Sequence, residues 1–469
     1  MRLGWLTQDT TGWPFRLAAM LFWMSAMLSR EHVANNLAAA LLARPWEPEA
    51  MLRAVQSVLG KRQPAAHRAL IQKLVSARVE PPLPSPRHIA SLLLASPEFD
   101  LAARAVTNGR KRHRMALAAP LPQPAIALSE LPVPRFATLG ELGRWLDLSD
   151  SELDWFADAR RQSAKTRIPV LQHYRYHLLT KRNGALRLIE APKPTMKRIH
   201  RQILRAILDH LPAHDAAHGF VAKRSCRTHA GLHAGEQIVV TLDIANFFAT
   251  TPVGRVHQIF ASLGYPWNVA RALTSLCTTA APPRVLKPLK RSARAQDRLV
   301  AQDLARYHLP QGAPTSPALA NLAAWRLDVR LSGLARAFDA NYSRYADDLA
   351  FSGDAMLAQR AKSFLDGVAE IVRDEGYSIN GEKTRVMTAS RRQQMTGIVV
   401  NSSPNVGRNI YDVMKATLHN CIRHGPTSQN HQRHPDFRAH LDGRVGWVEQ
   451  VNAARGAKLR RLFERIAWS

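Results

Sequence analysis

Arg344-Tyr345-Ala346-Asp347-Asp348 places two neighbouring carboxylates between two short strand-like segments, 341–344 and 349–352. A β-hairpin with both acids at its tip is the simplest interpretation. Successive strand side chains point to opposite faces, but the geometry of a hairpin tip can let both acids approach one cation, or let one bind while the other supports it. An acid pair also occurs in solvated turns, so its meaning depends on the rest of the chain.

A third carboxylate ends a separate strand-like segment. Gln237-Ile238-Val239-Val240-Thr241-Leu242-Asp243-Ile244 is rich in β-branched residues and predicts a buried strand that ends at Asp243. Read alone, Asp243 could cap a strand-to-helix turn. With Asp347 and Asp348 it supplies the oxygen ligands that magnesium prefers. Nucleotidyl transfer uses two such ions to activate the attacking hydroxyl and to stabilise the leaving group. No His/Cys ligand cluster competes for this role.

Three motifs together resemble those of the reverse transcriptases. Arg344-Tyr345-Ala346-Asp347-Asp348 is similar to the YxDD signature, and Leu309-Pro310-Gln311-Gly312-Ala313-Pro314-Thr315-Ser316-Pro317 is similar to the QGxPxSP motif of that family. Asp243-Ile244-Ala245-Asn246-Phe247-Phe248 resembles its first metal-binding motif. They occur in the family's order and at its intervals, and the resemblance covers about residues 140–469. It implies an α+β, right-hand polymerase fold with fingers, palm and thumb.

The resemblance also implies roles for individual residues. Two Mg²⁺ ions would be bound by the catalytic carboxylates and one backbone carbonyl, namely Asp243, Asp347, Asp348 and Ile244. The nucleotide would be contacted by a set of residues from several motifs: Lys181, Arg187, Phe248, Gln311, Gly312 and Lys383. Phe248 would be the ring that excludes a ribonucleotide's 2′-hydroxyl, although it could also be plain core filling. Arg187 suits a triphosphate because guanidinium matches phosphate geometry; by itself it could be a solvated strand residue.

Further stretches are similar to the retron group of bacterial reverse transcriptases. Glu190-Ala191-Pro192-Lys193-Pro194, Ala217-His218-Gly219-Phe220 and Lys223-Arg224-Ser225 carry this likeness. That group has an NAxxH motif before the first aspartate, where this chain has His229-Ala230-Gly231-Leu232-His233. It also has a VTG triplet after the palm, where this chain has Met395-Thr396-Gly397. His233 could equally be a satisfied structural histidine.

The charge of the chain favours a nucleic-acid partner. Sixty-five Lys and Arg oppose 36 Asp and Glu, for a net charge of +29. Basic clusters recur at 110–114, 287–294 and 391–392, which is typical of proteins that bind a polyanion. An anionic membrane surface, or no special partner, are the alternatives. In the C-terminal region Lys415, Arg423 and Arg438 are the expected RNA contacts, by likeness to the retron thumb.

Composition changes along the chain predict four parts. Residues 1–108 predict a helical N-terminal domain, and 109–136 a basic, Pro-rich linker. Fingers and palm would occupy 137–400 and a helical thumb 401–469. Within them we expect a hairpin from 174–179 and 186–189, helices at 195–211, 316–334 and 354–374, and short strands at 377–379 and 384–387. The apolar run 17–29 is too short to span a bilayer and predicts a buried helix.

The three cysteines are far apart, which argues against disulfides or a zinc site and favours a cytoplasmic location. The retron likeness implies copying of a cognate structured non-coding RNA into short DNA. It further implies priming from an RNA 2′-hydroxyl, a branched RNA–DNA product (msDNA) and a role in antiphage defence with an effector protein. The alternatives are a group II intron maturase, which would carry a longer C-terminal region, another phage-defence or CRISPR-linked reverse transcriptase, and a non-catalytic RNA-binding scaffold.

Overall fold

The computed structural model describes residues 30–42, 48–60, 63–76, 86–107, 131–158, 162–166, 168–181 and 183–468. The chain forms two compact units, Met1–His210 with Thr251–Pro314, and Leu211–Thr250 with Thr315–Ser469. These units cut across the domains predicted from the sequence, so the predicted boundaries stay predictions. The apolar run 17–29, the basic cluster 110–114 and most of the predicted linker lie outside the described residues. Within the described ranges no helix is long and apolar enough to cross a membrane.

The N-terminal part of the first unit is a bundle of helices, as the sequence predicts. The bundle contains α2 (Arg30–Leu42), α3 (Pro48–Leu59), α4 (Pro64–Ser76), α5 (Pro86–Leu94) and α6 (Pro97–Thr107). Four of them begin with proline, which suits the first helical position because its missing N–H has no partner there. Their apolar faces share one core that includes Leu37, Met51, Leu70, Leu93 and Phe99, all fully buried.

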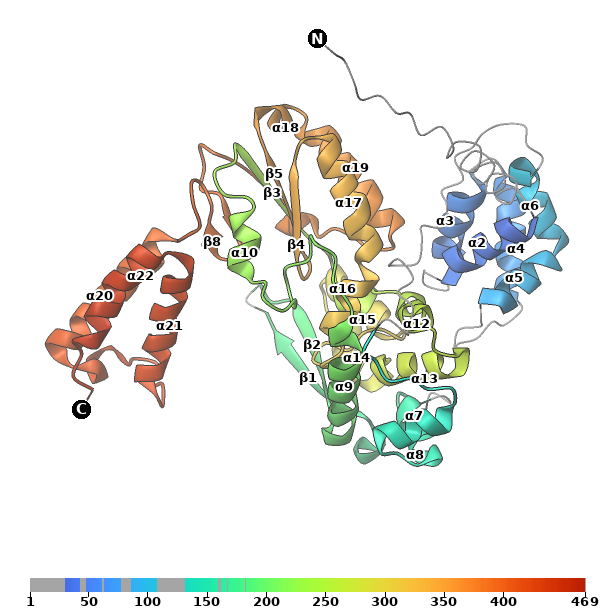
Figure 1. Ribbon diagram of the computed structural model, residues 1–469, viewed down its shortest axis with the longest axis horizontal. Coiled ribbons are helices and arrows are strands. Elements are labelled where there is room, and N and C mark those ends of the chain that lie inside the picture. The colour runs from blue at the N-terminus through green and yellow to red at the C-terminus, as the bar shows by residue number, and fades with distance from the viewer. Residues whose placement is uncertain are drawn as a thin grey trace, which may run out of the picture. The chain divides into compact units, whose positions relative to one another are not determined.

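The remainder of the first unit carries a β-hairpin beside a long helix (Figure 1). Strands β1 (Tyr174–Thr180) and β2 (Leu186–Pro192) pair antiparallel, which confirms the predicted hairpin, and α9 (Pro194–Ala206) follows directly. The helix predicted at 195–211 therefore ends at Ala206, and a 3₁₀ turn (Leu208–His210) follows it. Around these lie α7 (Leu139–Leu146), α8 (Asp150–Ala157), the 3₁₀ turn η2 (Pro169–Leu171), α12 (Val253–Ser262), α13 (Trp267–Cys277), α14 (Pro283–Arg291) and α15 (Ala295–Leu304).

Buried polar contacts hold the hairpin to its neighbours. Asp297 of α15 accepts a hydrogen bond from the Leu186 backbone N–H at 3.1 Å, at the start of β2. The carboxylate of Glu190 lies 2.7 Å from Nε2 of His308, and both side chains are buried. Because buried charges need partners, these contacts fix where the segment that leads into Gln311 meets the strand β2.

The second unit is built on an antiparallel sheet of order β4-β5-β3-β6. Its strands are β3 (Ile238–Asp243), β4 (Asn341–Tyr345), β5 (Asp348–Gly353) and β6 (Arg385–Thr388). Alternate side chains point to opposite faces. One face packs on α17 (Trp325–Ala337) and α19 (Ala361–Asp374), where Phe351 stacks on Tyr342 and meets Phe364 edge-on (Figure 1). The α+β class predicted from the sequence is confirmed.

The C-terminal part of this unit is helical, as predicted. Helices α20 (Arg408–His424), α21 (Phe437–Val451) and α22 (Ala453–Glu464) lie side by side (Figure 1). They follow a small sheet of β7 (Gln394–Met395), β8 (Ile398–Val399) and β9 (Asn405–Val406). Their core is continuous with buried residues of the main sheet, including Val239 and Ala350.

Three predicted elements differ from the observed ones. The single helix predicted at 316–334 is two helices, α16 (Ser316–Ala323) and α17, because the backbone at Ala324 leaves the helical region with ψ near 0°. The helix predicted at 354–374 is likewise divided into α18 (Ala355–Gln359) and α19 at Arg360. The strand predicted at 377–379 does not form; only Ile379 makes an isolated bridge, to Ile244.

The buried Glu190–His308 pair makes a pH-dependent contribution to stability. Burial alone would lower the pKa of His308, but the charge of Glu190 and their hydrogen bond raise it above its ordinary value. A raised pKa means that this stabilisation is fully present below about pH 6.5 and is lost as pH rises through the folded-state pKa. We expect the difference in free energy of unfolding between wild type and His308→Gln to shrink from pH 6 to pH 9, measured by urea denaturation.

His200 provides the control for this measurement. Burial lowers the pKa of His200 to about 4. The contribution of its neutral ring to the stability of the protein therefore decreases as pH falls below about 6.5. The same comparison with His200→Gln should show the opposite trend. A His308→Gln difference that grows with pH would contradict the assignment.

Candidate active site

Two strands far apart in the sequence bring the acidic residues together. In the register of β3 with β5, Asp243 is paired directly with Asp348. Side chains on directly opposed residues of neighbouring strands lie about 4.5–5.5 Å apart at their Cβ atoms. Asp347 stands in the turn before β5, and its carbonyl accepts a hydrogen bond from the Ile244 N–H at 2.8 Å. All three carboxylates therefore lie at one end of the sheet.

Mutual repulsion between these carboxylates shows in their proton affinity. Burial, followed by the negative charges of Asp347 and Asp243, raises the pKa of Asp348 to about 6. Burial and then the charge of Asp243 also raise the pKa of Asp347. Like charges held this close favour either a proton or a cation between them. The donor set, three carboxylates with no nitrogen or sulfur, suits a hard divalent cation such as magnesium.

The side chain of Asp243 is engaged by two groups from the segment after α19. The Lys383 Nζ lies 2.8 Å from its Oδ2 and the Asn380 amide donates to its Oδ1 at 3.2 Å. Burial alone would lower the pKa of Lys383, but the hydrogen bond to Asp243 raises it. Throughout the described part of the chain, no three His, Cys, Asp or Glu side chains are already arranged as a metal cluster. A cation binding here would either share the oxygens of Asp243 with Lys383 and Asn380 or replace Lys383 at one of them.

A buried guanidinium holds the turn that presents Asp347. Arg344 is fully buried and makes a two-pronged ion pair with Asp328 of α17, with N–O distances of 2.8 and 2.6 Å. Its remaining nitrogen donates to the Asn321 side chain at 2.9 Å and to the Ala346 carbonyl at 3.0 Å. Ala346 has a φ of 57°, which an L residue adopts only when its surroundings require it. Arg344 thus ties the strained residue before Asp347 to a helix.

The stretch 216–219 packs against the same turn. The His218 N–H donates to the Arg344 carbonyl at 2.7 Å, and the Arg344 N–H donates to the Ala216 carbonyl at 2.7 Å. A Cβ on Gly219 would clash with the Ala346 backbone nitrogen, so only glycine allows this approach. The motif Ala217-His218-Gly219-Phe220 therefore has a structural purpose, to support the turn from its second side.

Phe248, the predicted sugar gate, lies close to the first aspartate in the chain. It belongs to the short helix α11 (Phe247–Thr250), is half-buried, and has its ring 6.3 Å from that of Phe220 and 5.8 Å from that of Phe247. This position leaves part of the residue accessible to solvent. Its role toward the sugar stays a prediction.

Four of the predicted nucleotide-binding residues lie in the other unit. Lys181 and Arg187 are exposed residues of the β1–β2 hairpin and its turn. The Gln311 carbonyl accepts a hydrogen bond from the Glu190 N–H at 2.8 Å, and Gly312, with φ of 127°, lies against the Glu190 backbone. The structure thus brings the 311–312 loop to the strand that carries Arg187. The approach of this group to the three aspartates stays a prediction.

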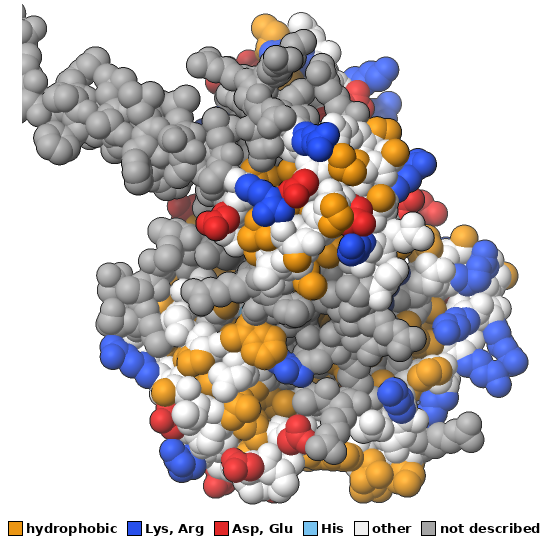
Figure 2. Space-filling model, turned by 90° about the vertical axis from the view of Figure 1, so that its right-hand side faces the viewer, with side chains coloured by type: hydrophobic (Ala, Val, Ile, Leu, Met, Phe, Trp, Pro, Cys, Tyr) orange, Lys and Arg blue, Asp and Glu red, His pale blue; other side chains and the backbone are white. Residues whose placement is uncertain are grey.

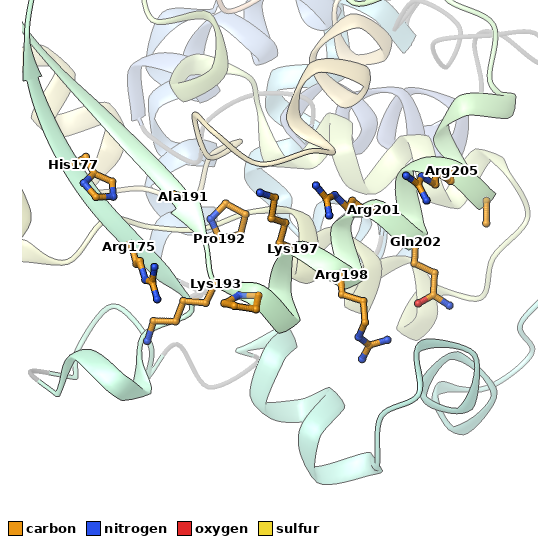
Figure 3. Close-up of a pocket in the computed structure, with 12 residues that line it drawn as sticks. Arg175, His177, Ala191, Pro192, Lys193, Lys197, Arg198, Arg201, Gln202 and Arg205 are labelled. Atoms are coloured by element: carbon orange, nitrogen blue, oxygen red, sulfur yellow. The ribbon is translucent and has the colours of Figure 1, made fainter. Parts of the chain in front are cut away.

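A strongly basic groove of about 780 Å³ lies between the hairpin and α9 (Figure 3). Among the residues that line it no side chain is acidic, and those with charged side chains are Arg175, Lys193, Lys197, Arg198, Arg201 and Arg205. Lys193 and Arg198 donate to backbone carbonyls, whereas Lys197, Arg201 and Arg205 are exposed and recur every four residues. Four residues of helix rise about 6 Å, so these three cations form a regular row.

The sequence interpretation missed this groove. The four-residue spacing of Lys197, Arg201 and Arg205 was visible in the sequence and could have indicated a basic helix face, but the contribution of Arg175 from a separate strand was not. On the face shown in Figure 2, several Lys and Arg side chains lie next to acidic and hydrophobic ones. The groove, with six cationic and no acidic side chains among its lining residues, is a place where a polyanion could bind.

The predicted RNA-binding residues of the C-terminal helices are accessible. Lys415 and Arg423 are exposed on α20, and Arg438 is exposed on α21 with its guanidinium 5.9 Å from the centre of the Trp468 ring. Accessibility permits contact with a nucleic-acid backbone. The contacts themselves stay predictions.

Comparison with known proteins places this geometry in context. Residues 179–400 match the family model for reverse transcriptase (RNA-dependent DNA polymerase). The Retron Mx65 reverse transcriptase of Myxococcus xanthus is 36% identical over 62% of this chain and 64% of its own length, and the Retron Mx162 reverse transcriptase of the same organism is 33% identical over 69% and 66%. The Retron Ec86 reverse transcriptase of Escherichia coli is 28% identical over 63% of this chain and 80% of its own length. This chain thus covers slightly less than two thirds of the two Myxococcus proteins.

One solved structure illustrates how far the likeness extends in three dimensions. A foamy viral protease–reverse transcriptase in complex with double-stranded DNA is 16% identical over 52% of this chain and 32% of its own, with a TM-score of 0.28. A score this low supports no comparison of the arrangement as a whole.

The Arg344–Asp328 pair can be tested apart from any activity. Removing one partner of a fully buried pair leaves an uncompensated charge, so Asp328→Leu should lower the free energy of unfolding by about 3–5 kcal/mol. The double variant Asp328→Leu/Arg344→Met should recover most of that loss. It should still lack the bond to the Ala346 carbonyl, so its 346–348 amides should exchange hydrogen faster than in wild type.

A matched control is the exposed pair Arg408–Asp412 on α20. Its removal should cost less than about 1 kcal/mol. Slow exchange at 346–348 in the double variant would show that Arg344 does not hold the turn.

Proposed function

We propose that this chain, whose residues 179–400 match the reverse transcriptase family and whose relatives are retron enzymes, is an RNA-directed DNA polymerase of the retron kind. The observation that carries the proposal is the strand register that pairs Asp243 with Asp348 beside Asp347. A polymerase needs carboxylates at one point to bind the ions that act on the nucleotide. The β3–β5 pairing supplies that point from two separate motifs.

Reverse transcriptases generally use divalent metal ions, and we propose two Mg²⁺ ions here. Asp243, Asp347, Asp348 and the carbonyl of Ile244 would hold them. When bound, such ions lower the pKa of the primer hydroxyl and neutralise charge on the departing pyrophosphate. The carboxylates of this chain would determine where the ions bind, and Lys383, if released from Asp243, would contact the triphosphate.

The incoming nucleotide would be held by residues of several motifs. Arg187 and Lys181 would contact the triphosphate, where a guanidinium can bind two phosphate oxygens at once. Gln311 and Gly312 would line the pocket, and Phe248 would exclude a 2′-hydroxyl. What supports this grouping is the contact between the 311–312 loop and the strand of Arg187, together with the short sequence interval from Asp243 to Phe248.

The template would be a cognate non-coding RNA. The basic groove and the exposed cations of α20 and α21 support binding of a phosphate backbone, in line with the net charge of +29. By likeness to the retron relatives, synthesis would start from an RNA 2′-hydroxyl, give a branched RNA–DNA product and serve antiphage defence with an effector protein. A reducing cytoplasmic location is part of this proposal, and it is supported by the absence of disulfide bonds among Cys226, Cys277 and Cys421, all of which lie in the described part of the chain.

The catalytic assignment predicts loss of synthesis without loss of fold. Asp347→Asn and Asp348→Asn remove one charge each from the carboxylate cluster, so primer extension on an RNA template with Mg²⁺ should fall at least 100-fold. Unfolding temperatures should not fall, because removing a like charge relieves repulsion in the cluster. Asp366→Asn, an exposed aspartate on α19, should leave extension unchanged. Folded Asp347→Asn with wild-type extension would refute the catalytic assignment of Asp347, whereas a folded wild type without extension would favour a non-catalytic RNA-binding scaffold.

The groove predicts a change in the salt dependence of RNA binding. Each phosphate neutralised contributes about 0.7–0.9 to the slope of log K against log salt. The triple variant Lys197→Ala/Arg201→Ala/Arg205→Ala should therefore reduce that slope by about 2–3, measured by filter binding of a structured RNA.

The control variant removes equal charge from exposed positions on the palm helices, as Arg336→Ala/Lys362→Ala/Arg373→Ala. It should change the slope by less than one unit. Equal losses in both triple variants would mean that net charge, and not the groove, attracts the RNA.

A further inference from the structure

Two buried histidines lie against the sheet face that carries the paired aspartates. His229 belongs to α10 (Cys226–Gly231), and His233 follows just after that helix ends. Both rings are almost completely buried, with 1% and 0% of their surface exposed. They come from the stretch His229-Ala230-Gly231-Leu232-His233, whose purpose the proposed chemistry does not explain.

The two rings are hydrogen-bonded to both strands of the β4–β5 hairpin. The Ser343 Oγ on β4 lies 2.7 Å from Nδ1 of His229 and 2.7 Å from Nε2 of His233. The Nδ1 of His233 lies 2.8 Å from the Ser352 Oγ on β5. One continuous chain of hydrogen bonds, His229–Ser343–His233–Ser352, therefore crosses from strand to strand through side chains.

This chain of hydrogen bonds lies on the same face of the sheet as the paired carboxylates of Asp243 and Asp348. In the register of β4 with β5, Tyr345 is paired with Asp348, Ser343 with Ala350, and Asn341 with Ser352. Every second residue points the same way, so Ser343 and Ser352 share the face of Tyr345 and Asp348. The His229 ring also lies 5.8 Å from the Tyr345 ring. A movement of His229 would therefore displace Ser343 or Tyr345 of β4, and Tyr345 lies within two residues of Asp347 at the hairpin tip.

Only one assignment of donors and acceptors along this chain of hydrogen bonds is consistent with the burial of its groups. The single proton of Ser343 serves one ring, so the other ring must donate to its oxygen. The Nε2 of His229 is buried with no hydrogen-bond partner. If the His229 proton is on Nδ1, then Nε2 carries only a lone pair. The group without a partner is then an acceptor, and no buried N–H is left without a hydrogen bond. His229 then donates to Ser343, Ser343 to His233, and His233 to Ser352.

This directional arrangement requires both rings to be neutral. Burial lowers the pKa of His229 to about 2 and that of His233 to about 3, so each ring carries one ring proton at neutral pH. Buried polar networks of this kind, when their bonds are made, rigidify and specify one local conformation. The opposite face of the hairpin is held by Arg344 and Asp328. The two attachments together leave the tip little freedom.

We propose that His229, His233, Ser343 and Ser352 are positioning residues for synthesis, which fix the β4–β5 hairpin so that Asp347 and Asp348 are held at their ion-binding places. This inference rests on the proposed function. These side chains touch neither nucleotide nor ion; they act through the hairpin. A misplacement of about 1 Å in a reacting group can lower a rate about 100-fold, so a loosened hairpin should reduce turnover more than nucleotide binding.

The experiment compares Ser343→Ala with wild type in the full chain, by steady-state primer extension on RNA with varied nucleotide. Ser343→Ala deletes the shared hydroxyl and should lower kcat about tenfold or more, with KM for the nucleotide changed less than twofold. Ser343→Thr keeps the hydroxyl and should restore most of kcat. Amides 345–349 should exchange hydrogen faster in Ser343→Ala than in wild type or Ser343→Thr.

The matched control is His200→Ala, which removes another buried histidine, bonded at 2.8 Å to the Leu276 carbonyl in the other unit. It should lower stability but leave kcat per folded molecule near that of wild type. If Ser343→Ala proves poorly folded, Ser352→Ala removes the bond to His233, together with a longer one of 3.4 Å from the Asn341 side chain, and should lower kcat two- to threefold.

The outcomes separate this inference from the proposed function. An inactive wild type would refute the polymerase assignment, and the exchange at 345–349 would still test the positioning role. An active wild type with unchanged kcat and unchanged exchange in Ser343→Ala would overturn the inference. A loss of kcat per folded molecule in His200→Ala equal to that in Ser343→Ala would also overturn it, since the effect would then be general destabilisation.

Discussion

The pairing of β3 with β5 forces three carboxylates into one place, and much of the second unit follows from that constraint. Asp243 and Asp348 face each other across the ladder, with Asp347 beside them. Burial and repulsion raise the pKa of both Asp347 and Asp348. Such an arrangement is unfavourable without positive charge, and Lys383 supplies some of it at Asp243. The geometry is costly for a resting protein and useful for one that binds cations together with a nucleotide.

Carboxylates that repel one another stay close together only if the backbone that carries them is held rigidly. Contacts on both faces of the sheet hold the β4–β5 hairpin. On one face Arg344 connects the Ala346 carbonyl to Asp328 on α17. On the other, α10 and the residues after it reach Ser343 and Ser352. Aromatic packing of Phe351 against Phe364 adds an apolar anchor near the far end of the same strand. Polar groups near the acids and apolar groups away from them divide the task of fixing the backbone.

Local sequence patterns predicted the strands and hairpins of this structure, because these elements depend on residues that are close together in the chain. The β-branched run before Asp243, the alternation around Tyr174 and the acids after Tyr345 indicated strands and hairpins that the structure contains. The break at Ala324 was not legible because Leu319, Ala323, Leu327 and Leu331 recur every four residues across it, which is a helical spacing. The Arg344–Asp328 pair and the groove around Arg175 and Arg201 join distant segments, which no single-sequence pattern specifies. The family resemblance supplied roles for site residues that spacing alone could not.

The central claim is that Asp243 and Asp348 share divalent ions during synthesis. The most direct measurement is a crystal structure of the protein with an RNA template, a primer, a non-hydrolysable nucleotide and Mn²⁺, located by its anomalous signal. The account predicts metal peaks within about 2.3 Å of carboxylate oxygens of both residues, between them and the triphosphate, with Lys383 released from Asp243. Metal bound elsewhere, with the Lys383–Asp243 pair intact beside an ordered nucleotide, would contradict it.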